Sequence, residues 1–134
     1  MPDPRIERAT PLSGVQIEDI ENKLGRELPN DYRDFLTDYG GAFIGGFVDG
    51  SDELPISQFF GGKENHSILD VLKLYSDLRD EKILPIADCE FGNLYVLDYD
   101  NSIHYIDYYG EETTSRRVAS NFTDFLDRIV IEEN

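Results

Sequence analysis

The sequence predicts an α+β fold, a single domain in which helices pack on a mainly antiparallel sheet. A chain of 134 residues suits one domain with a core of its own. Hydrophobic residues make up 40% of it, too large a share for a disordered acidic tail. Helical segments alternate with runs of consecutive strand-like segments joined by short loops, which favours antiparallel pairing. The expected order of elements is α-α-β-β-α-β-β-β-β-α.

The first eleven residues differ in composition from the rest of the chain. Residues 1–11 hold three prolines and several charges, so we expect an extended N-terminal arm. Residues 12–134 contain no internal repeat and no linker that would divide them, so we expect them to form the one α+β domain.

The first helix is expected between Ser13 and Gly25. Ser13 can cap it, and Gln16, three residues later, completes a capping box. Gly25 can end the helix because glycine adopts the left-handed conformation of a C-terminal cap. The apolar side of the helix consists of Val15, Ile17, Ile20 and Leu24.

The second helix is expected in the stretch LPNDYRDFLTDYGG, residues 28–41. Pro29 suits the first helical position, where its missing N–H costs nothing. Gly40 can stop the helix in the left-handed conformation. Four residues fall at the i, i+3, i+4, i+7 spacing of one helical face: Tyr32, Phe35, Leu36 and Tyr39.

Two strands and a third helix come next. Residues 42–48 and 54–60 read as strands joined by the acidic loop 49–53, and residues 61–66 read as a loop. Ser67 can cap the third helix. The apolar stripe of this helix consists of Ile68, Val71, Leu72, Tyr75 and Leu78.

Strands then dominate until a closing helix. Four consecutive strands are expected over residues 83–89, 92–99, 102–109 and 113–119. The middle two form a hairpin that turns at Asp100-Asn101. Asn121 can cap the last helix. Its apolar face consists of Phe122, Phe125, Leu126, Ile129 and Val130.

Charge is the most pronounced feature of the composition. The 28 acidic and 12 basic residues give a net charge of −16, which repels phosphate backbones and anionic membranes. The same field attracts a basic protein partner, although an acidic surface also serves solubility alone. We expect a cytoplasmic protein for three reasons. The single cysteine cannot form an internal disulfide, and the N-terminal residues contain no apolar signal segment. No apolar run approaches the roughly 18 residues that a membrane-spanning helix needs.

No residue pattern predicts a metal or cofactor site. The candidate metal ligands are scattered and follow no metal-binding spacing: His66, Cys89 and His104. The segment from Asp98 to Ser102 resembles the start of a calcium loop. Ile103 stands where that loop requires glycine, and Tyr109 stands where it requires the bidentate glutamate. We therefore expect no metal and no cofactor.

Catalytic patterns are equally absent from the sequence. No nucleophile elbow or phosphate-binding loop occurs, and Cys89 lies between two acidic residues, which disfavour a thiolate nucleophile. With so many carboxylates a chance pair is expected, so a small carboxylate-dependent hydrolase remains an alternative that a deep cleft with two convergent carboxylates would favour. The main expectation is a protein that is not an enzyme.

A partner-binding surface is the remaining possibility, and it is best sought between residues 88 and 112. This span holds seven acidic residues and no Lys or Arg, with five tyrosines between them. Tyrosines supply rigid buried area at protein interfaces, although a solvated hairpin without a partner would show the same pattern. The predicted partner-binding residues are Asp98, Asp100, Asp107, Tyr108, Glu111 and Glu112.

Several segments together resemble a known family. Residues 28–41 carry the L-P-x-x-Y-x-x-F-L pattern followed by a glycine pair, and the segment LPIADCEFGNLYVLD has Gly92 and Asn93 opening a strand that ends in Asp98. The segments IHYIDY and VASNFTDFLDRI come after these in order, although a tryptophan often seen in the former is missing. Over residues 12–131 the sequence resembles the SUKH superfamily of the Smi/Knr type.

This resemblance implies an α+β fold and, for bacterial members, the role of an immunity protein. Such proteins bind a cognate toxin domain in the cytoplasm and block it without chemistry of their own, and many of the toxins are nucleases. Fungal relatives act instead in cell-wall synthesis and its signalling, so a regulatory or scaffold protein is the alternative. Because a nuclease must be basic to hold its substrate, an acidic inhibitor would suit it. The resemblance does not supply the predicted interface residues.

Overall fold

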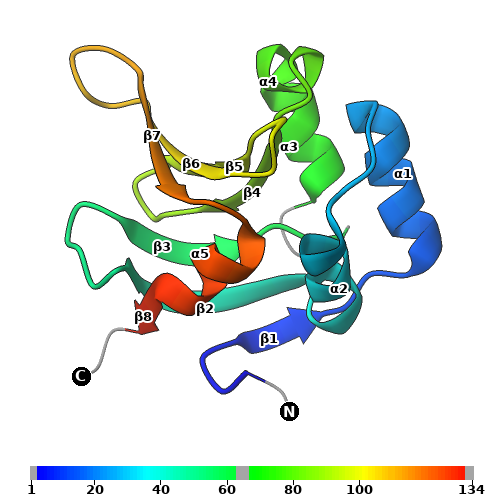
Figure 1. Ribbon diagram of the computed structural model, residues 1–134, viewed down its shortest axis with the longest axis horizontal. Coiled ribbons are helices and arrows are strands. Elements are labelled where there is room, and N and C mark those ends of the chain that lie inside the picture. The colour runs from blue at the N-terminus through cyan, green and yellow to red at the C-terminus, as the bar shows by residue number, and fades with distance from the viewer. Residues whose placement is uncertain (1–2, 63–66, 132–134) are drawn as a thin grey trace.

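The computed structural model describes residues 3–62 and 67–131, within which five helices pack against an eight-stranded antiparallel sheet (Figure 1). The helices are α1 (Gly14–Leu24), α2 (Asn30–Asp38), α3 (Ile68–Leu74), α4 (Ser76–Asp80) and α5 (Phe122–Arg128). The strands are β1 (Glu7–Thr10), β2 (Gly41–Val48), β3 (Pro55–Phe59), β4 (Leu84–Asp88), β5 (Leu94–Leu97), β6 (Ile103–Asp107), β7 (Thr114–Ala119) and β8 (Ile129–Ile131). The predicted α+β fold is confirmed.

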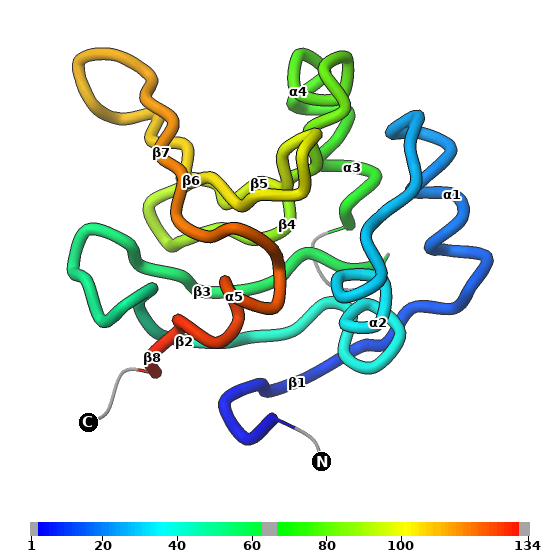
Figure 2. The backbone as a smooth tube through the Cα atoms, viewed as in Figure 1, coloured from blue at the N-terminus to red at the C-terminus, as the bar shows by residue number. Residues whose placement is uncertain are grey.

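The sheet is a meander, which the backbone tube of Figure 2 makes easy to trace. From β2 to β7 each strand pairs with the next one in sequence. Because successive strands run in opposite directions, the β2–β3, β4–β5 and β6–β7 connections all leave the sheet at one end. The β5–β6 turn leaves it at the other. The end of the sheet at which a connection lies therefore determines where the predicted partner-binding residues lie.

Both faces of the central strands are buried. All four residues of β5 are buried, as are the first four of β4. On one face α2 and α5 form an aromatic core, with ring centroids 5.0 Å apart for Tyr32 and Phe122 and 5.2 Å apart for Tyr95 and Phe125. Burying large aromatic side chains in such contacts contributes strongly to stability. The described residues contain no helix long and apolar enough to cross a membrane.

The residues predicted to begin and end the first two helices make the expected kinds of contact in the structure, except that Pro29 is shifted by one position. Ser13 Oγ accepts a hydrogen bond from the Gln16 amide, and the Gln16 side chain accepts one from the Ser13 amide, so the capping box is complete. Gly25 ends α1 with φ of 85°. Pro29 caps α2 from the position before its first residue, one residue earlier than expected. Gly40, with φ of 65°, lies so close to Thr10 that an added Cβ would collide with the carbonyl oxygen of Thr10.

Three short elements differ from the predicted order. Residues 7–10 of the expected arm form strand β1, which pairs with the first half of β2. The third helix divides at Tyr75, whose φ of −114° and ψ of 58° are not helical, so α4 follows α3. The last helix ends at Arg128, and the β-branched residues after it form β8 on the second half of β2. Residues 63–66 of the expected loop lie outside the described residues.

Candidate functional site

Three connections at one end of the meander form the candidate site. We call it the loop end and define it as residues 49–54, 88–93 and 107–113. In Figure 1 these segments lie along the left side of the molecule, with the β6–β7 loop uppermost. Segments that are about twenty to sixty residues apart in the sequence are neighbours here because every second turn of a meander leaves the sheet at the same end.

The loop end is strongly acidic. It contains no Lys or Arg, and its acidic residues are Asp49, Asp52, Glu53, Asp88, Glu90, Asp107, Glu111 and Glu112. Two arginines reach it from neighbouring elements. Arg116 of β7 approaches Glu53 at 3.3 Å, and Arg128 of α5 approaches Asp49 at 3.3 Å. These ion pairs are largely exposed and therefore weak, so they leave most of the negative charge uncompensated.

Two aromatic rings project into solvent among these carboxylates. Phe91 is 67% exposed and Tyr109 is 72% exposed. Tyr109 packs over Gly92, where an added Cβ would lie 2.8 Å from its hydroxyl oxygen. An exposed aromatic pair in an acidic surround resembles the composition of protein interfaces, where aromatic side chains anchor and charges form the rim.

Tyr108 is held more firmly than its neighbour. Its ring lies 5.6 Å from the ring of Tyr75 at the end of α3, and its amide donates to Asn93 Oδ1 at 2.9 Å. Burial raises the pKa of Tyr108 to about 12, so the hydroxyl stays neutral. Tyr108 therefore braces the β6–β7 loop while part of its surface remains accessible.

A groove separates the β2–β3 loop from the β6–β7 hairpin. It has a volume of about 380 Å³. It is lined by Glu53, Leu54, Tyr105, Asp107, Thr114 and Arg116. The Tyr105 hydroxyl accepts a hydrogen bond from Asn93 Nδ2 at 3.0 Å, which fixes the floor of the groove. The groove is bounded by two carboxylates and one arginine, so a cationic side chain of a partner could compete with Arg116 for Glu53.

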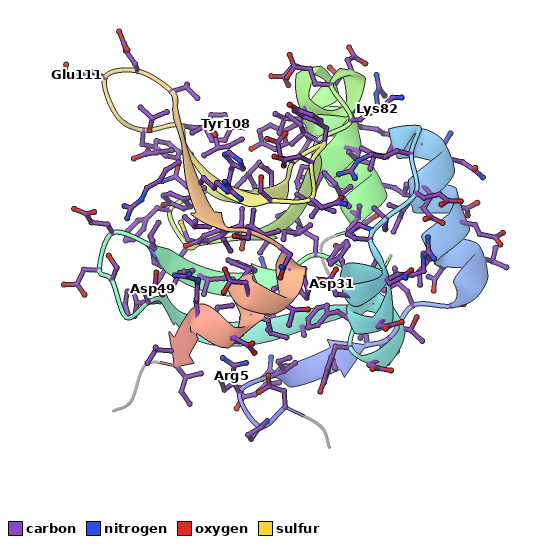
Figure 3. The ribbon with its side chains drawn as sticks, viewed as in Figure 1. Arg5, Asp31, Asp49, Lys82, Tyr108 and Glu111 are labelled. Atoms are coloured by element: carbon purple, nitrogen blue, oxygen red, sulfur yellow. The ribbon has the colours of Figure 1, made fainter. Side chains whose placement is uncertain are left out.

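The structure separates the six predicted partner-binding residues into two groups. Asp107, Tyr108, Glu111 and Glu112 lie in the loop end, and Figure 3 shows Tyr108 and Glu111 in this region. Asp98 and Asp100 lie in the β5–β6 turn at the opposite end of β6, a strand of five residues that spans roughly 17 Å. The two groups do not form one surface.

The carboxylates of Asp98 and Asp100 already contact other residues of the protein. Asp98 Oδ2 lies 3.3 Å from His104 Nε2. Asp100 Oδ1 accepts hydrogen bonds from the Ser102 amide at 3.0 Å and from Ser102 Oγ at 2.5 Å, and these bonds lower the pKa of Asp100 below its ordinary value. Arg26 secures the turn from outside the sheet. It donates to the Asp98 carbonyl at 2.8 Å and to Asn101 Oδ1 at 2.8 Å.

The same turn brings a serine, a histidine and an aspartate together, but not in the geometry of a catalytic triad. Ser102 Oγ lies 3.0 Å from His104 Nε2, the nitrogen that also faces Asp98. A triad places the nucleophile and the carboxylate on different ring nitrogens. Here Nδ1 faces Ser115 Oγ at 3.3 Å, and Ser102 is 1% exposed. The arrangement joins β5, β6 and β7.

The described residues contain no group of three or more His, Cys, Asp or Glu side chains that could hold a metal ion. Of the scattered candidates, Cys89 is buried, His104 lies in β6 with its ring against Asp98 and Ser102, and His66 lies outside the described residues. Local sequence patterns did not predict that residues 49–54 and the exposed ring of Phe91 belong to the loop end. The strand order alone would have found them, because the turns of a meander alternate between its ends.

This chain is similar to a known bacterial protein and matches a family model. The SPbeta prophage-derived uncharacterized protein YokK of Bacillus subtilis (strain 168) is 29% identical to it over 108 residues, covering 64% of this chain. This chain spans 56% of that relative, little more than half its length. The model of the SMI1/KNR4 family (SUKH-1) matches residues 11–128, nearly the whole chain. The protein therefore belongs to the SMI1/KNR4 family (SUKH-1).

Proposed function

We propose that this protein is a bacterial immunity protein that binds a cognate basic toxin domain through the loop end and neutralises it by occlusion. The observation that carries the proposal is the loop end itself. Eight carboxylates and two exposed aromatic rings meet there, and its three segments contain no Lys or Arg. The family membership supports the role, and the local composition supports the mode of binding.

The chemistry of the loop end suits a basic partner. Its negative field steers a positively charged domain and raises the rate of association. Phe91 and Tyr109 then provide apolar area that becomes buried on docking, and the carboxylates form the rim. A nuclease-type toxin fits this surface well, because its own substrate-binding face must be basic. The protein would act in the cytoplasm, and inhibition needs no chemistry from it.

The proposal is tested with the product of the neighbouring gene, where we expect a cognate toxin domain to be encoded. We expect the two proteins to co-purify and the affinity to fall as salt rises. The double variant Glu111→Lys/Glu112→Lys should weaken binding by about tenfold or more and make the salt dependence shallower, because attractive charges have been removed. Binding is measured by calorimetry at several salt concentrations.

A matched control separates local contact from overall charge. Asp34→Lys/Asp38→Lys changes the net charge by the same amount on exposed positions of α2, outside the loop end. The control should keep most of the affinity. Equal weakening by both variants would show that only the overall field matters, and failure of the wild-type pair to associate would overturn the proposed partner.

A further inference from the structure

We propose that the cleft between α1 and α3 is a binding site for a small phosphate monoester with an apolar body. The cleft has a volume of about 440 Å³. Its lining consists of Lys23, Ser67, Leu69, Asp70, Leu72, Lys73 and Arg79. This inference does not depend on the proposed function, because the cleft shares no residue with the loop end.

The charge of the cleft is opposite to that of the rest of the molecule. Acidic residues outnumber basic ones 28 to 12 in the chain, yet among the residues that the structure describes, three cations and one carboxylate line this cavity. The local net charge of +2 matches a phosphoryl group, which carries roughly −1.5 to −2 at pH 7. A carboxylate ligand would leave one of these positive charges uncompensated.

The cations of the cleft remain available to a ligand. Within the described part of the chain, Lys23 and Lys73 have no ion-pair partner, whereas Arg5, Arg33 and Arg128 each approach a carboxylate within 3.3 Å. Among the described carboxylates, Arg79 approaches only that of its exposed neighbour Asp80, at 3.5 Å. An exposed pair of this kind contributes little, so Arg79 can exchange it for a phosphate oxygen.

The uncharged residues of the lining indicate which kind of organic group should be attached to the phosphate. Leu69 and Leu72 also line the cavity, and the half-buried Leu69 can contact an apolar group of the ligand, with the buried Leu72 beneath it in the core. A small hollow of about 70 Å³ adjoins the cavity, shares Ser67 and Leu69 with it and is lined partly by Asp19. The carboxylate of Asp19 disfavours an anion there, so the phosphoryl group belongs in the larger cavity.

The test is a titration of the full chain monitored by NMR at pH 7.5. Three probes separate the two parts of the ligand: phenyl phosphate, inorganic phosphate and phenol. We expect phenyl phosphate to shift the amide resonances of the residues that line the cleft and to bind more tightly than inorganic phosphate. Phenol should leave these resonances unchanged, because it lacks the charge that the cations attract.

Variants assign the binding to the cleft. Lys73→Glu should weaken phenyl phosphate binding by about tenfold, since one charge-assisted contact is lost. Lys82→Glu carries the same charge change at an exposed position outside the cleft and should bind as the wild type does. Asp70→Asn should tighten binding, because it removes the carboxylate that the described residues contribute to the lining, and this gain cannot arise from loss of folding.

Three results would overturn the proposal. The first is no shift at millimolar phenyl phosphate, and the second is a response that Lys73→Glu and Asp70→Asn leave unchanged. The third is equal affinity for phenyl phosphate and inorganic phosphate, which would remove the apolar part of the assignment. Failure of the toxin experiment would leave all three measurements unaffected, so the two proposals are tested separately.

Discussion

The two ends of the β-meander are both acidic, but their carboxylates have different surroundings. In the β5–β6 turn, Asp98 and Asp100 face His104 and Ser102, and Arg26 binds the backbone around them. At the loop end, Glu111 and Glu112 are exposed and have no hydrogen bond or ion pair to other residues of the described chain. Whether an acidic residue has a structural role or is available to a partner therefore depends on the residues that it contacts more than on its local sequence.

The largest expected effect is the loss of the arginine that secures the β5–β6 turn. Arg26→Ala should lower the free energy of unfolding by about 2–3 kcal/mol, because the backbone carbonyls of Lys82 and Asp98 and the Asn101 side chain lose a charged donor. Urea denaturation at neutral pH measures this loss. Lys82→Ala, which removes a nearby exposed cation, should change stability by less than about 0.5 kcal/mol. A loss below about 1 kcal/mol for Arg26→Ala would show that the turn does not depend on it.

At the loop end we expect the backbone, rather than the acidic side chains, to matter for stability. Gly92→Ala should cost about 1–2 kcal/mol, because Gly92 has φ of 86° and an added Cβ would also meet the Tyr109 hydroxyl. Tyr109→Ala alone should change stability by less than about 0.5 kcal/mol, since the ring is largely exposed. Denaturation of the double variant separates the two causes. If removing the ring restores full stability to Gly92→Ala, steric contact and not φ is the cause.

Helices with local signals could be predicted from the sequence. The capping box at Ser13 and Gln16 and the left-handed Gly25 depend only on residues close in the chain, so their pattern is sufficient. Strands β1 and β8 could not be found in the same way. Both exist because they pair with opposite halves of the same edge of β2, whereas local apolar spacing places Ile129 and Val130 in a helix. Tertiary pairing overrides the weak local preference there.

The candidate site could be predicted only in part, for a related reason. The sequence-based prediction placed Asp98 and Asp100 in one surface with Glu111 and Glu112 because these residues are close in sequence. In the structure β6 lies between the two pairs and holds them at opposite ends of the sheet. The acidic loop 49–53 is recognisable in the sequence, but its place beside the β6–β7 loop depends on the strand order. The α1–α3 cleft combines Lys23 with Lys73 and Arg79, which are about fifty residues away, and no sequence spacing indicates such a meeting.

A smaller effect is expected for the acidic residue whose pKa the β5–β6 turn lowers. The folded state lowers the pKa of Asp100 below 3.8, so its stabilising contribution is present above that value and is lost as the pH falls through the lower folded pKa. Asp100→Asn should cost about 0.5–1 kcal/mol at neutral pH, since the side chain is exposed and its bonds are screened. It should also reduce the loss of stability on acidification below about pH 4. Urea denaturation from about pH 2 to about pH 7 provides the measurement, and an unchanged pH profile would contradict the role of Ser102 as donor.

The smallest effect is expected for the carboxylates that we assign to partner binding. Glu111→Gln and Glu112→Gln should each change the free energy of unfolding by less than about 0.5 kcal/mol, with a slight gain where repulsion from neighbouring acids is relieved. Urea denaturation of these variants and of Asp100→Asn under the same conditions compares the loop end directly with the β5–β6 turn. A loss of about 1 kcal/mol or more would mean that these carboxylates support the fold, and the loop end would then resemble the β5–β6 turn. A near-zero effect on stability, together with weaker toxin binding in the lysine variants, would mean that these acidic residues serve a partner and not the fold.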